Sequence, residues 1–372
     1  MDLQHGDGLV FTPSQVAVLR WIPVFPGLLS AIGSFLIAQR VVRSKKLRGT
    51  TYERLMLGLS SVDILNSIRL MVVPARYFPF TDPSPACTAS GFLITLGFAG
   101  PMYNAVLSMY YLLVVVYDFT AHRIEQSYEL WFHIIPIAYG VSAAFLGLAM
   151  GVYNPERDSV TCWVAEWPHR CVGDECERGP LSAVFATAVV YVPLLGVLIL
   201  LIATNTAIFV KVRSVFRKTS EYSMSSRNLS GRQSFSSKIS EPPKGVVKDG
   251  AAQDPPSRLE RGSSSFRFSS STSSPTDCKI RQVGVQSILY VVAYLFCYIW
   301  SLIAGIATLL APDRVERGDF FSLTVVEMTL FPAQGLFNAF VYARPVYERA
   351  RRQDPDLSRW QCFRKALLDP ME

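Results

Sequence analysis

Apolar windows alternate with short polar segments along most of the chain. The windows carry almost no charge, and they run at about 18–40, 55–76, 89–117, 131–152, 181–210, 284–311 and 321–343. Each is long enough for an α-helix to cross a hydrocarbon core of roughly 30 Å, which takes about 20 residues. Seven such windows in one chain indicate seven transmembrane helices rather than the buried helices of a soluble protein.

Composition supports this interpretation. Apolar residues make up 50% of the 372 residues and charged residues only 17%, whereas soluble domains carry about 25% charged residues. Residues 1–17 contain Asp2 and Asp7 but no lysine or arginine, so they lack the basic region of a cleaved signal peptide. We therefore expect an all-α membrane protein, a seven-transmembrane helix bundle over 18–343 that follows an extracellular N-terminus over 1–17.

The distribution of lysine and arginine predicts the orientation, because cytoplasmic loops carry an excess of both. If the N-terminus is outside, the short cytoplasmic segments hold 14 of these residues and the external segments hold 7. The tail, 344–372, then lies in the cytoplasm, as expected of a multi-pass protein of the plasma membrane. The net charge of +7 follows from this topology and from attraction to anionic lipid, so no nucleic-acid partner is expected.

Four of the seven cysteines fall on the predicted outer side, where disulfides persist. We predict a Cys87–Cys162 bridge from the third helix to the second external loop, and a local Cys171–Cys176 ring. Cys87–Cys171 is the alternative pairing. No Cys and His spacing fits a tetrahedral metal site, and the four histidines are scattered along the chain. We therefore expect neither a metal nor a cofactor, and no enzyme active site.

The third cytoplasmic loop has a biased composition. Residues 212–282 contain 19 serines in 71 positions and few large apolar side chains, which predicts a disordered loop. Ser220, Ser230 and Ser264 each follow an arginine by three residues, so phosphorylation would place negative charge on a partner-facing loop. The expected regulators are kinases that phosphorylate these serines and arrestin-like proteins that bind the phosphorylated loop. The alternative is an inert linker.

The cytoplasmic tail begins with a short basic and amphipathic stretch. Proline is well tolerated at a helix start, and the arginines that follow Pro345 suit lipid headgroups. We expect a short amphipathic helix over Pro345–Ala350, extended toward Leu368, that lies on the inner leaflet with membrane lipid as its partner. Cys362 in this tail is either palmitoylated or unmodified.

Polar residues inside the windows indicate functional positions, because a charge at membrane depth is costly. Asp63 and Asn66 share one face of the second helix, and Gln334 and Asn338 share one face of the seventh. We predict that Asp63, Asn66 and Asn338 form a mid-membrane polar cluster. A kink at Pro332 would act as a hinge beside it. The alternative is that these groups only stabilise the packing of neighbouring helices.

A second group of polar residues lies nearer the predicted outer ends of the helices: Arg69, Tyr103, Asn104, Trp300 and Glu327. We expect them to line a cavity that is open to the outside and binds a ligand. Arg69 is the residue expected to hold an anionic group of that ligand, unless Glu327 acts instead as its counter-ion.

Several motifs resemble those of G-protein-coupled receptors. Leu59–Asp63 (Leu-Ser-Ser-Val-Asp) resembles the Leu-x-x-x-Asp pattern of the second helix. Tyr110–Leu113, Cys162-Trp163 and above all Gln334–Tyr342 (Gln-Gly-Leu-Phe-Asn-Ala-Phe-Val-Tyr) resemble the cyclic-AMP-receptor-like and secretin-like branches. Chains of this layout occur in protists, algae and fungi. The resemblance covers the seven helices and implies switch roles for Gly335 and Tyr342 as well.

Other motifs separate the chain from rhodopsin-like receptors. The third helix ends in Tyr117-Asp118-Phe119 instead of Asp-Arg-Tyr, the sixth helix lacks Cys-Trp-x-Pro, and the seventh lacks Asn-Pro-x-x-Tyr. A retinal Schiff base would need a lysine in the last helix, and 321–343 contain none. The N-terminus is also too short for the hormone-binding ectodomain of secretin-like receptors, so a ligand is expected within the bundle and the external loops.

The resemblance implies a receptor that transmits an extracellular small-molecule or peptide signal to a heterotrimeric G protein by helix rearrangement. Movement of the sixth helix would open a cytoplasmic cleft, with these candidate contacts: Arg123, Lys211, Arg213, Arg281 and Arg344. The alternative role of each is binding to lipid headgroups. The alternative function is a seven-helix transporter of a small solute, although the sequence contains no internal repeat.

Overall fold

The computed structural model describes residues 11–77, 82–156, 161–169, 171, 173–236, 275–311, 314 and 318–368. Its α-helices are α1 (Pro13–Trp21), α2 (Val24–Arg43), α3 (Lys45–Arg48), α4 (Thr51–Tyr77), α5 (Pro85–Leu96), α6 (Ala99–Val115), α7 (Ala121–Ser127), α8 (Glu129–Ala149), α9 (Ser182–Phe185), α10 (Val192–Ser236), α11 (Pro275–Leu310), α13 (Phe321–Leu330), α14 (Gln334–Gln353) and α15 (Arg359–Leu368). Shorter elements are the strands β1 (Tyr153–Pro155) and β2 (Cys162–Val164), the 3-10 helices η1 (Gly173–Glu175) and η3 (Phe331–Ala333), and the π-helix η2 (Ala186–Tyr191).

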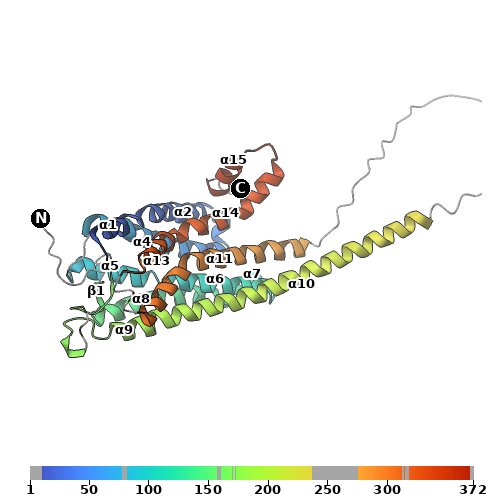
Figure 1. Ribbon diagram of the computed structural model, residues 1–372. Helices are drawn as coiled ribbons and strands as arrows, with labels where there is room; N and C mark the ends of the chain where they lie inside the picture. The colour runs from blue at the N-terminus through green and yellow to red at the C-terminus, as the bar shows by residue number, and fades with distance from the viewer. Residues whose placement is uncertain are drawn as a thin grey trace, which may run out of the picture. The chain divides into compact units, whose positions relative to one another are not determined.

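The predicted spans correspond to α1–α2, α4, α5–α6, α8, α9–α10, α11 and α13–α14 (Figure 1). Among the described residues, five helical stretches are long and apolar enough to cross a membrane by length and composition: Pro13–Arg43, Pro85–Val115, Glu129–Ala149, Ser182–Val215 and Gln282–Ala307. The other two spans, α4 and α13–α14, carry polar residues that are buried in the bundle, such as Asp63 and Asn338. Helix α2 packs against α4 and α14, and α8 packs against α5 and α6.

The first and third spans are interrupted where the sequence predicted unbroken helices, and the seventh is interrupted at its predicted kink. Pro23 separates α1 from α2, because proline lacks the N–H that the helix needs and crowds the preceding turn. Gly97 ends α5, and Pro101 follows in the first turn of α6. Pro332 lies in η3, between α13 and α14. The predicted kink of the seventh helix is therefore a short 3-10 segment.

The predicted disorder of 212–282 is wrong at both ends of that range. Helix α10 continues to Ser236 and α11 begins at Pro275, whereas 237–274 lie outside the described residues. Residues 211–236 contain no proline and a single glycine, so no strong helix breaker stops the helix that the fifth span starts. Val210–Arg281 form a compact unit of their own, whose described residues are these two helical extensions.

The tail also differs from the prediction. Helix α14 runs through Pro345 to Gln353, and the amphipathic helix is the separate α15. Arg344 and Glu348, four residues apart, form an ion pair of 2.8 Å that supports the continued helix. The apolar face of α15 packs against α14 and α2 around Ala343 and Ala366. Cys362 is only 1% exposed there, so its thiol is not presented for modification.

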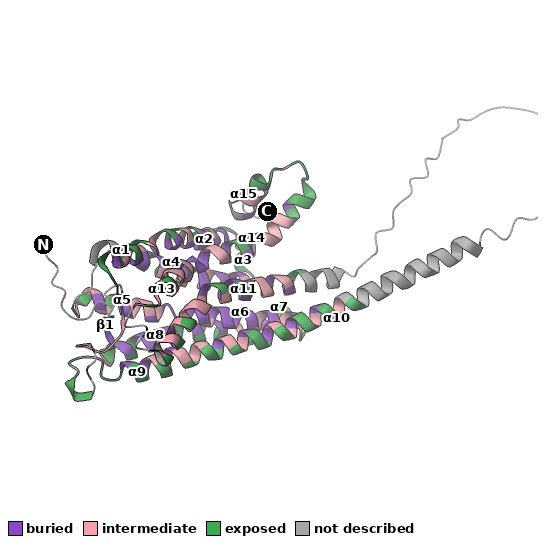
Figure 2. Ribbon diagram, viewed as in Figure 1, coloured by how far each residue is buried: buried purple, intermediate pink, exposed green. Residues whose placement is uncertain are grey.

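Burial separates the two sides of the spanning helices. Figure 2 shows buried residues gathered between the helices and exposed residues on their outer faces. On α8, for example, Trp131, Ile135 and Phe145 are more than half exposed, whereas Phe132 and Ala144 are buried. A wide apolar face that stays uncovered in the folded chain is what contact with lipid requires.

Candidate functional site

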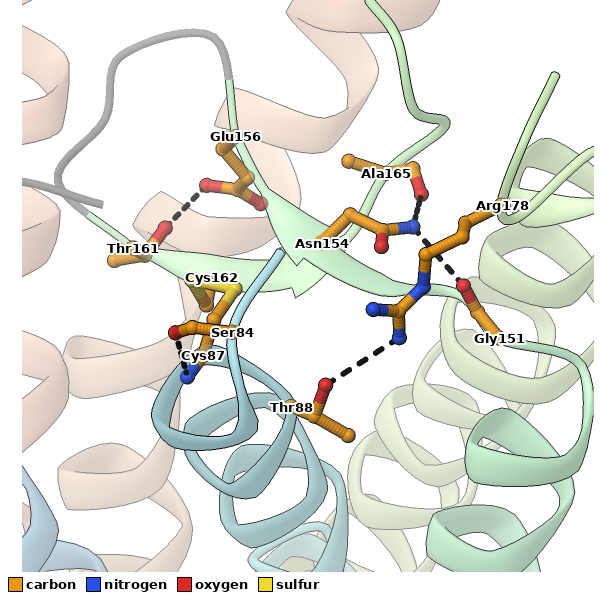
Figure 3. The surroundings of a disulfide bond; sticks show 10 residues. All are labelled: Ser84, Cys87, Thr88, Gly151, Asn154, Glu156, Thr161, Cys162, Ala165 and Arg178. Atoms are coloured by element: carbon orange, nitrogen blue, oxygen red, sulfur yellow. Dashed lines mark hydrogen bonds between the residues drawn. A yellow bond between two sulfur atoms is a disulfide. The ribbon is translucent and has the colours of Figure 1, made fainter. Parts of the chain in front are cut away.

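A hairpin tethered by a disulfide closes one end of the bundle, which we name the disulfide end (Figure 3). Strands β1 and β2 pair in antiparallel register. Cys162 of β2 is bonded to Cys87 in the first turn of α5, and Cys171 is bonded to Cys176. Both predicted disulfides are confirmed, and the alternative Cys87–Cys171 pairing is wrong.

Hydrogen bonds hold the chain on both sides of the hairpin (Figure 3). The Asn154 side chain donates to the carbonyls of Gly151 and Ala165 at 3.0 and 2.7 Å. Arg178 donates to Thr88 Oγ1 of α5 at 3.3 Å. The loop that follows α8 is therefore fixed to α5 by the Cys87–Cys162 disulfide and by the hydrogen bond from the Arg178 guanidinium.

The side chain of Tyr153 holds the hairpin against α8. Its ring is fully buried, and its hydroxyl donates to the carbonyl of Ala144 at 2.9 Å. Gly91 leaves room for this ring, because a Cβ there would lie 2.7 Å from Tyr153 Cδ1. Burial raises the pKa of the Tyr153 hydroxyl to about 12, so the group remains a neutral donor at physiological pH.

A cavity of about 580 Å³ lies beneath the hairpin. Its walls come from the hairpin and its flanks, α4, η2, α11, α13 and η3, represented by Trp163, Arg69, Tyr191, Tyr298, Glu327 and Phe331. Small-molecule sites typically enclose about 300–1,000 Å³ and are mostly apolar with a few polar groups. The cavity has this size and this composition.

Arg69 reaches the cavity from α4 and is only 8% exposed. Its Nε has no hydrogen-bond partner, and within the described part of the chain no carboxylate forms an ion pair with its guanidinium. Glu327 lines the same cavity from α13, and no ion pair between Glu327 and Arg69 is found among the described residues. Ser301 of α11 also lines the cavity, and its Oγ is buried without a hydrogen-bond partner in the described part of the chain.

Three residues that the sequence placed in this cavity lie elsewhere. The hydroxyl of Tyr103 lies 3.3 Å from His133 Nδ1 of α8, and Asn104 donates to the carbonyl of Gly100 at 3.1 Å. Trp300 is not among the described residues that line the cavity, and its buried Nε1 has no hydrogen-bond partner among them. The rotation of α6 and α11 about their own axes decides these positions, and polar spacing alone does not determine that rotation.

A polar cluster lies midway along the bundle. Asp63 of α4 accepts hydrogen bonds from Asn338 Nδ2 at 3.0 Å and from Ser34 Oγ at 3.5 Å. Gln334 donates to Asn338 Oδ1 at 3.2 Å. Asn66, which was expected in the same cluster, faces α5 instead, where its amide occupies the space beside Gly97. Ser34 of α2 is the member that sequence reasoning missed, because a serine in an apolar window gives little signal.

Segment η3 connects the cavity to this cluster. Phe331 and Pro332 line the cavity, and Gln334 begins α14 directly after η3. A change in the conformation of η3 would therefore move cavity residues and cluster residues together.

The opposite end of the bundle, where α15 packs, is named the tail end and holds a second polar group. Gln286 of α11 donates to the Tyr52 hydroxyl at 2.8 Å, and the Tyr52 and Tyr290 hydroxyls lie 3.0 Å apart. Tyr342 of α14 donates to Glu53 Oε2 at 2.7 Å. We name these five residues the tail-end cluster. It joins α4 to α11 and α14.

Sequence reasoning included only Tyr342 of this tail-end cluster. Glu53 was the available signal, since it is an acidic residue beside an apolar window in a loop that is otherwise basic. Its neighbour Arg54 forms ion pairs with Glu129 and Glu125, which connect α4 to α8 and α7.

A third polar chain joins α6, α10 and α11. Ser108 Oγ lies 2.5 Å from Thr204 Oγ1 and accepts a hydrogen bond from Asn205 Nδ2 at 3.0 Å. Ser287 donates to Asn205 Oδ1 at 3.2 Å. None of these residues was predicted, because single hydroxyl and amide groups are common in transmembrane helices and stabilise packing there.

The candidate G-protein contacts lie on several elements. Arg123 is exposed on α7, with its guanidinium carbon 4.1 Å from the Phe119 ring centroid. Arg344 of α14 pairs with Glu348. Lys211 and Arg213 lie in α10, and Arg281 lies in α11. Of the candidate phosphorylation sites, Ser220 and Ser230 lie in α10, and Ser264 lies outside the described residues.

No protein-family model matches the sequence, and no curated protein matches it. The structure does match that of squid rhodopsin, a G-protein-coupled receptor, with a TM-score of 0.57 over 99% of this chain and 98% of that chain. The two sequences are 12% identical. The chain has a rhodopsin-like fold. The prediction of a seven-transmembrane helix bundle is confirmed, and the protein is a multi-pass membrane protein.

A rhodopsin-like fold at this identity carries no binding residues from squid rhodopsin to this chain. The cyclic-AMP-receptor-like branch stays a prediction, as does the orientation of the termini. The missing lysine in 321–343 still argues against a retinal Schiff base here.

Proposed function

We propose that the protein is a G-protein-coupled receptor that transmits an external signal to a heterotrimeric G protein. The observation that carries this proposal is a rhodopsin-like bundle whose disulfide end encloses a cavity of ligand size. In this proposal the disulfide end faces the outside of the plasma membrane and the tail end faces the cytoplasm. The charges of the loops and the oxidising conditions that disulfides need support that orientation.

A ligand in the cavity would act on two neighbouring spans. Tyr298 of α11 and Phe331 of η3 both line the cavity, and their ring centroids are 5.1 Å apart. A ligand that binds more tightly to one arrangement of these rings shifts the bundle toward it by that difference in affinity. Through η3 the same ligand acts on α14, where Asn338 binds Asp63.

In this proposal, the hydrogen bonds of the tail-end cluster stabilise the resting state of the receptor. Tyr52 connects α4 to α11 through Gln286 and Tyr290. The resemblance to G-protein-coupled receptors implies that outward movement of α11 opens a cleft for the C-terminal helix of Gα. Breaking the hydrogen bonds to Tyr52 is then the step that separates the resting state from the active state.

The proposed contacts of the G protein are Arg123 and Arg344 in the bundle, and Lys211, Arg213 and Arg281 in the helical extensions of α10 and α11. Ser220 and Ser230 are proposed sites for a kinase, since each follows an arginine by three residues and a phosphate there would change the charge that a partner or an arrestin-like regulator meets. Helix α15, with Trp360 exposed, is the segment proposed to contact inner-leaflet lipid.

The direct test is nucleotide exchange by a panel of co-expressed Gα subunits in membranes that carry the full chain, with and without tissue or cell extracts as a ligand source. We expect exchange above that of matched empty membranes for at least one subunit, with a further rise on addition of an active extract. Arg213→Ala and Arg281→Ala should reduce that exchange without reducing the amount of protein at the surface.

Absence of exchange for every Gα subunit, with the protein folded at the surface, would contradict the receptor proposal. The transporter alternative would then be tested by uptake of labelled solutes into vesicles that contain the protein.

A further inference from the structure

We infer that the cavity binds a ligand with one anionic group on an apolar body, and that Arg69 holds the anion. This inference rests on the proposed function, because it names the class of ligand that the receptor would recognise. Three observations support it. Arg69 forms no ion pair among the described residues, the cavity walls are mostly apolar, and the polar groups of the cavity lie at a similar depth.

The burial of Arg69 is the first observation. Arg69 is 8% exposed, its Nε is buried without a hydrogen-bond partner, and its guanidinium forms no ion pair among the described residues, so burial removes hydration from this charge without supplying a counter-charge. Buried charges in proteins are normally paired, and arginine suits planar two-oxygen groups such as carboxylate and phosphate. We therefore expect an anionic group of the ligand to pair with the Arg69 guanidinium.

The depth of the polar groups is the second observation. Arg69 lies eight residues before Tyr77, the end of α4, and Ser301 lies nine residues before Leu310, the end of α11. At 1.5 Å per residue both lie roughly 12–14 Å below the ends of their helices. Ser301 Oγ is buried without a partner on the same cavity. It offers the ligand a second polar contact at a similar depth.

The remaining walls define the rest of the ligand. Phe98, Leu194, Leu198, Ile299 and Met328 surround the cavity, so the part of the ligand that fills it must be apolar. Glu156, Glu166 and Glu327 also lie on its walls. Carboxylates repel negative charge, so a ligand gains from one anionic group placed at Arg69 and gains nothing from a further negative charge elsewhere in the cavity. The walls therefore favour a ligand with a single anionic group over a polyanion.

The test measures thermal unfolding of the purified full chain in lipid nanodiscs, with probes that differ only in charge. Benzoate, naphthalene-2-carboxylate and decanoate are each compared with the matching primary amide. The two aromatic acids are supplied in water and decanoate is supplied in the bilayer, so the comparison also shows from which phase the cavity fills. We expect at least one acid to raise the unfolding temperature more than its amide does.

Arg69→Gln should remove this preference for the acid, with a loss of acid affinity of about 10- to 100-fold. Ligand-free Arg69→Gln should unfold at the same temperature as the wild type or higher, because the substitution removes an uncompensated buried charge. Arg20→Gln, a basic residue of α1 that does not line the cavity, is the matched control and should keep the preference. Arg69→Lys keeps the charge and should retain a weaker preference.

Equal stabilisation by acids and amides in the wild type would overturn the inference, and so would an acid preference that survives in Arg69→Gln. Neither result depends on a G protein, so the receptor proposal would stand or fall separately on nucleotide exchange. Conversely, acid binding that leaves exchange unchanged for every Gα subunit would support the anion site and contradict the receptor proposal.

Discussion

Asp63 is a buried ionisable side chain near the middle of α4. It lies 12 residues after Thr51, the start of α4, which places it roughly 18 Å along the helix. A carboxylate at that depth is costly unless donors surround it, and Ser34 and Asn338 supply them from two other helices. The position therefore couples α2, α4 and α14 through one residue.

Asp63→Asn is expected to alter signalling more than folding. Asparagine keeps an oxygen that can accept from Asn338, so the free energy of unfolding should change by less than about 1 kcal/mol. The loss of charge should change ligand-stimulated nucleotide exchange several-fold while the surface level, measured by antibody labelling, remains near that of the wild type.

Ser61→Ala is the control for that substitution, since Ser61 is an exposed residue of the same helix whose hydroxyl, among the described residues, bonds only to the Leu57 carbonyl. A proportional loss of exchange and surface level in Asp63→Asn would show that the residue serves packing alone.

At the residue scale, the sequence predicted Asp63, Asn338 and Arg69 because a charge or an amide in an apolar window is a strong signal. Tyr103, Asn104 and Trp300 were misplaced because the sequence does not determine the rotation of each helix. Tyr52 and Gln286 were missed for another reason. Tyrosine and glutamine near a helix end suit many environments, so only their pairing across helices reveals them.

At the element scale, α2 and α14 approach closely where small residues face each other. The Gly335 N–H donates to Ser30 Oγ at 3.0 Å. A Cβ on Gly33 would lie 2.9 Å from the Gly335 carbonyl oxygen and 3.2 Å from Leu336 Cα. Both are backbone atoms, which cannot turn away as a flexible side chain would.

Gly33→Ala is therefore expected to destabilise the protein by about 1–3 kcal/mol through overpacking. Gly196→Ala is the matched control, because a Cβ there meets no atom within 4 Å. This control should stabilise its helix by up to about 1 kcal/mol, the difference in helix propensity between glycine and alanine. Thermal unfolding in detergent measures both, and shifts of the same sign would contradict the packing argument.

The two disulfides differ in the size of the loop that each closes. Cys87 and Cys162 are 75 residues apart, whereas Cys171 and Cys176 are 5 apart. Loop-closure entropy predicts a contribution of about 4–5 kcal/mol for the first and about 2 kcal/mol for the second. The first also holds the hairpin over the cavity.

Cys87→Ser should remove a mobility shift seen on gels without reductant and should reduce surface delivery strongly. Cys171→Ser should cost less surface protein, since it frees only a local ring. Equal surface levels of the two variants would mean that the hairpin needs no tether.

At the element scale, the hydrophobic pattern predicted the spans but not all of their breaks and ends. Apolar windows located every span, because membrane thickness sets a length that the sequence displays directly. The kink at Pro332 was predicted, whereas the break at Pro23 was less visible, because proline is tolerated in transmembrane helices when neighbouring helices satisfy the freed backbone groups. The continuation of α10 to Ser236 was missed because serine content was taken as evidence of disorder in a stretch without proline.

At the scale of the whole molecule, three polar groups lie in series along the bundle. Arg69 occupies the cavity at the disulfide end, the Asp63–Asn338 pair lies midway, and Tyr52 joins α4 to α11 at the tail end. If the protein is a receptor, a ligand binds at the first group, and the resulting conformational change reaches the G protein at the last group. The series gives that coupling a physical route through η3 and α11.

Tyr52→Phe tests this central claim without a known ligand. The change removes one hydroxyl and with it the contacts to Gln286 and Tyr290. The loss of two hydrogen bonds should favour release of α11 by about 5- to 100-fold. Tyr117→Phe is the control, because Tyr117 is 61% exposed at the same end of the bundle.

The measurement is basal nucleotide exchange by the Gα panel in membranes with matched surface levels of wild type, Tyr52→Phe and Tyr117→Phe. The account predicts that Tyr52→Phe raises basal exchange for at least one subunit, while Tyr117→Phe stays at the wild-type rate. Exchange equal to that of empty membranes for all three proteins and every subunit would contradict it.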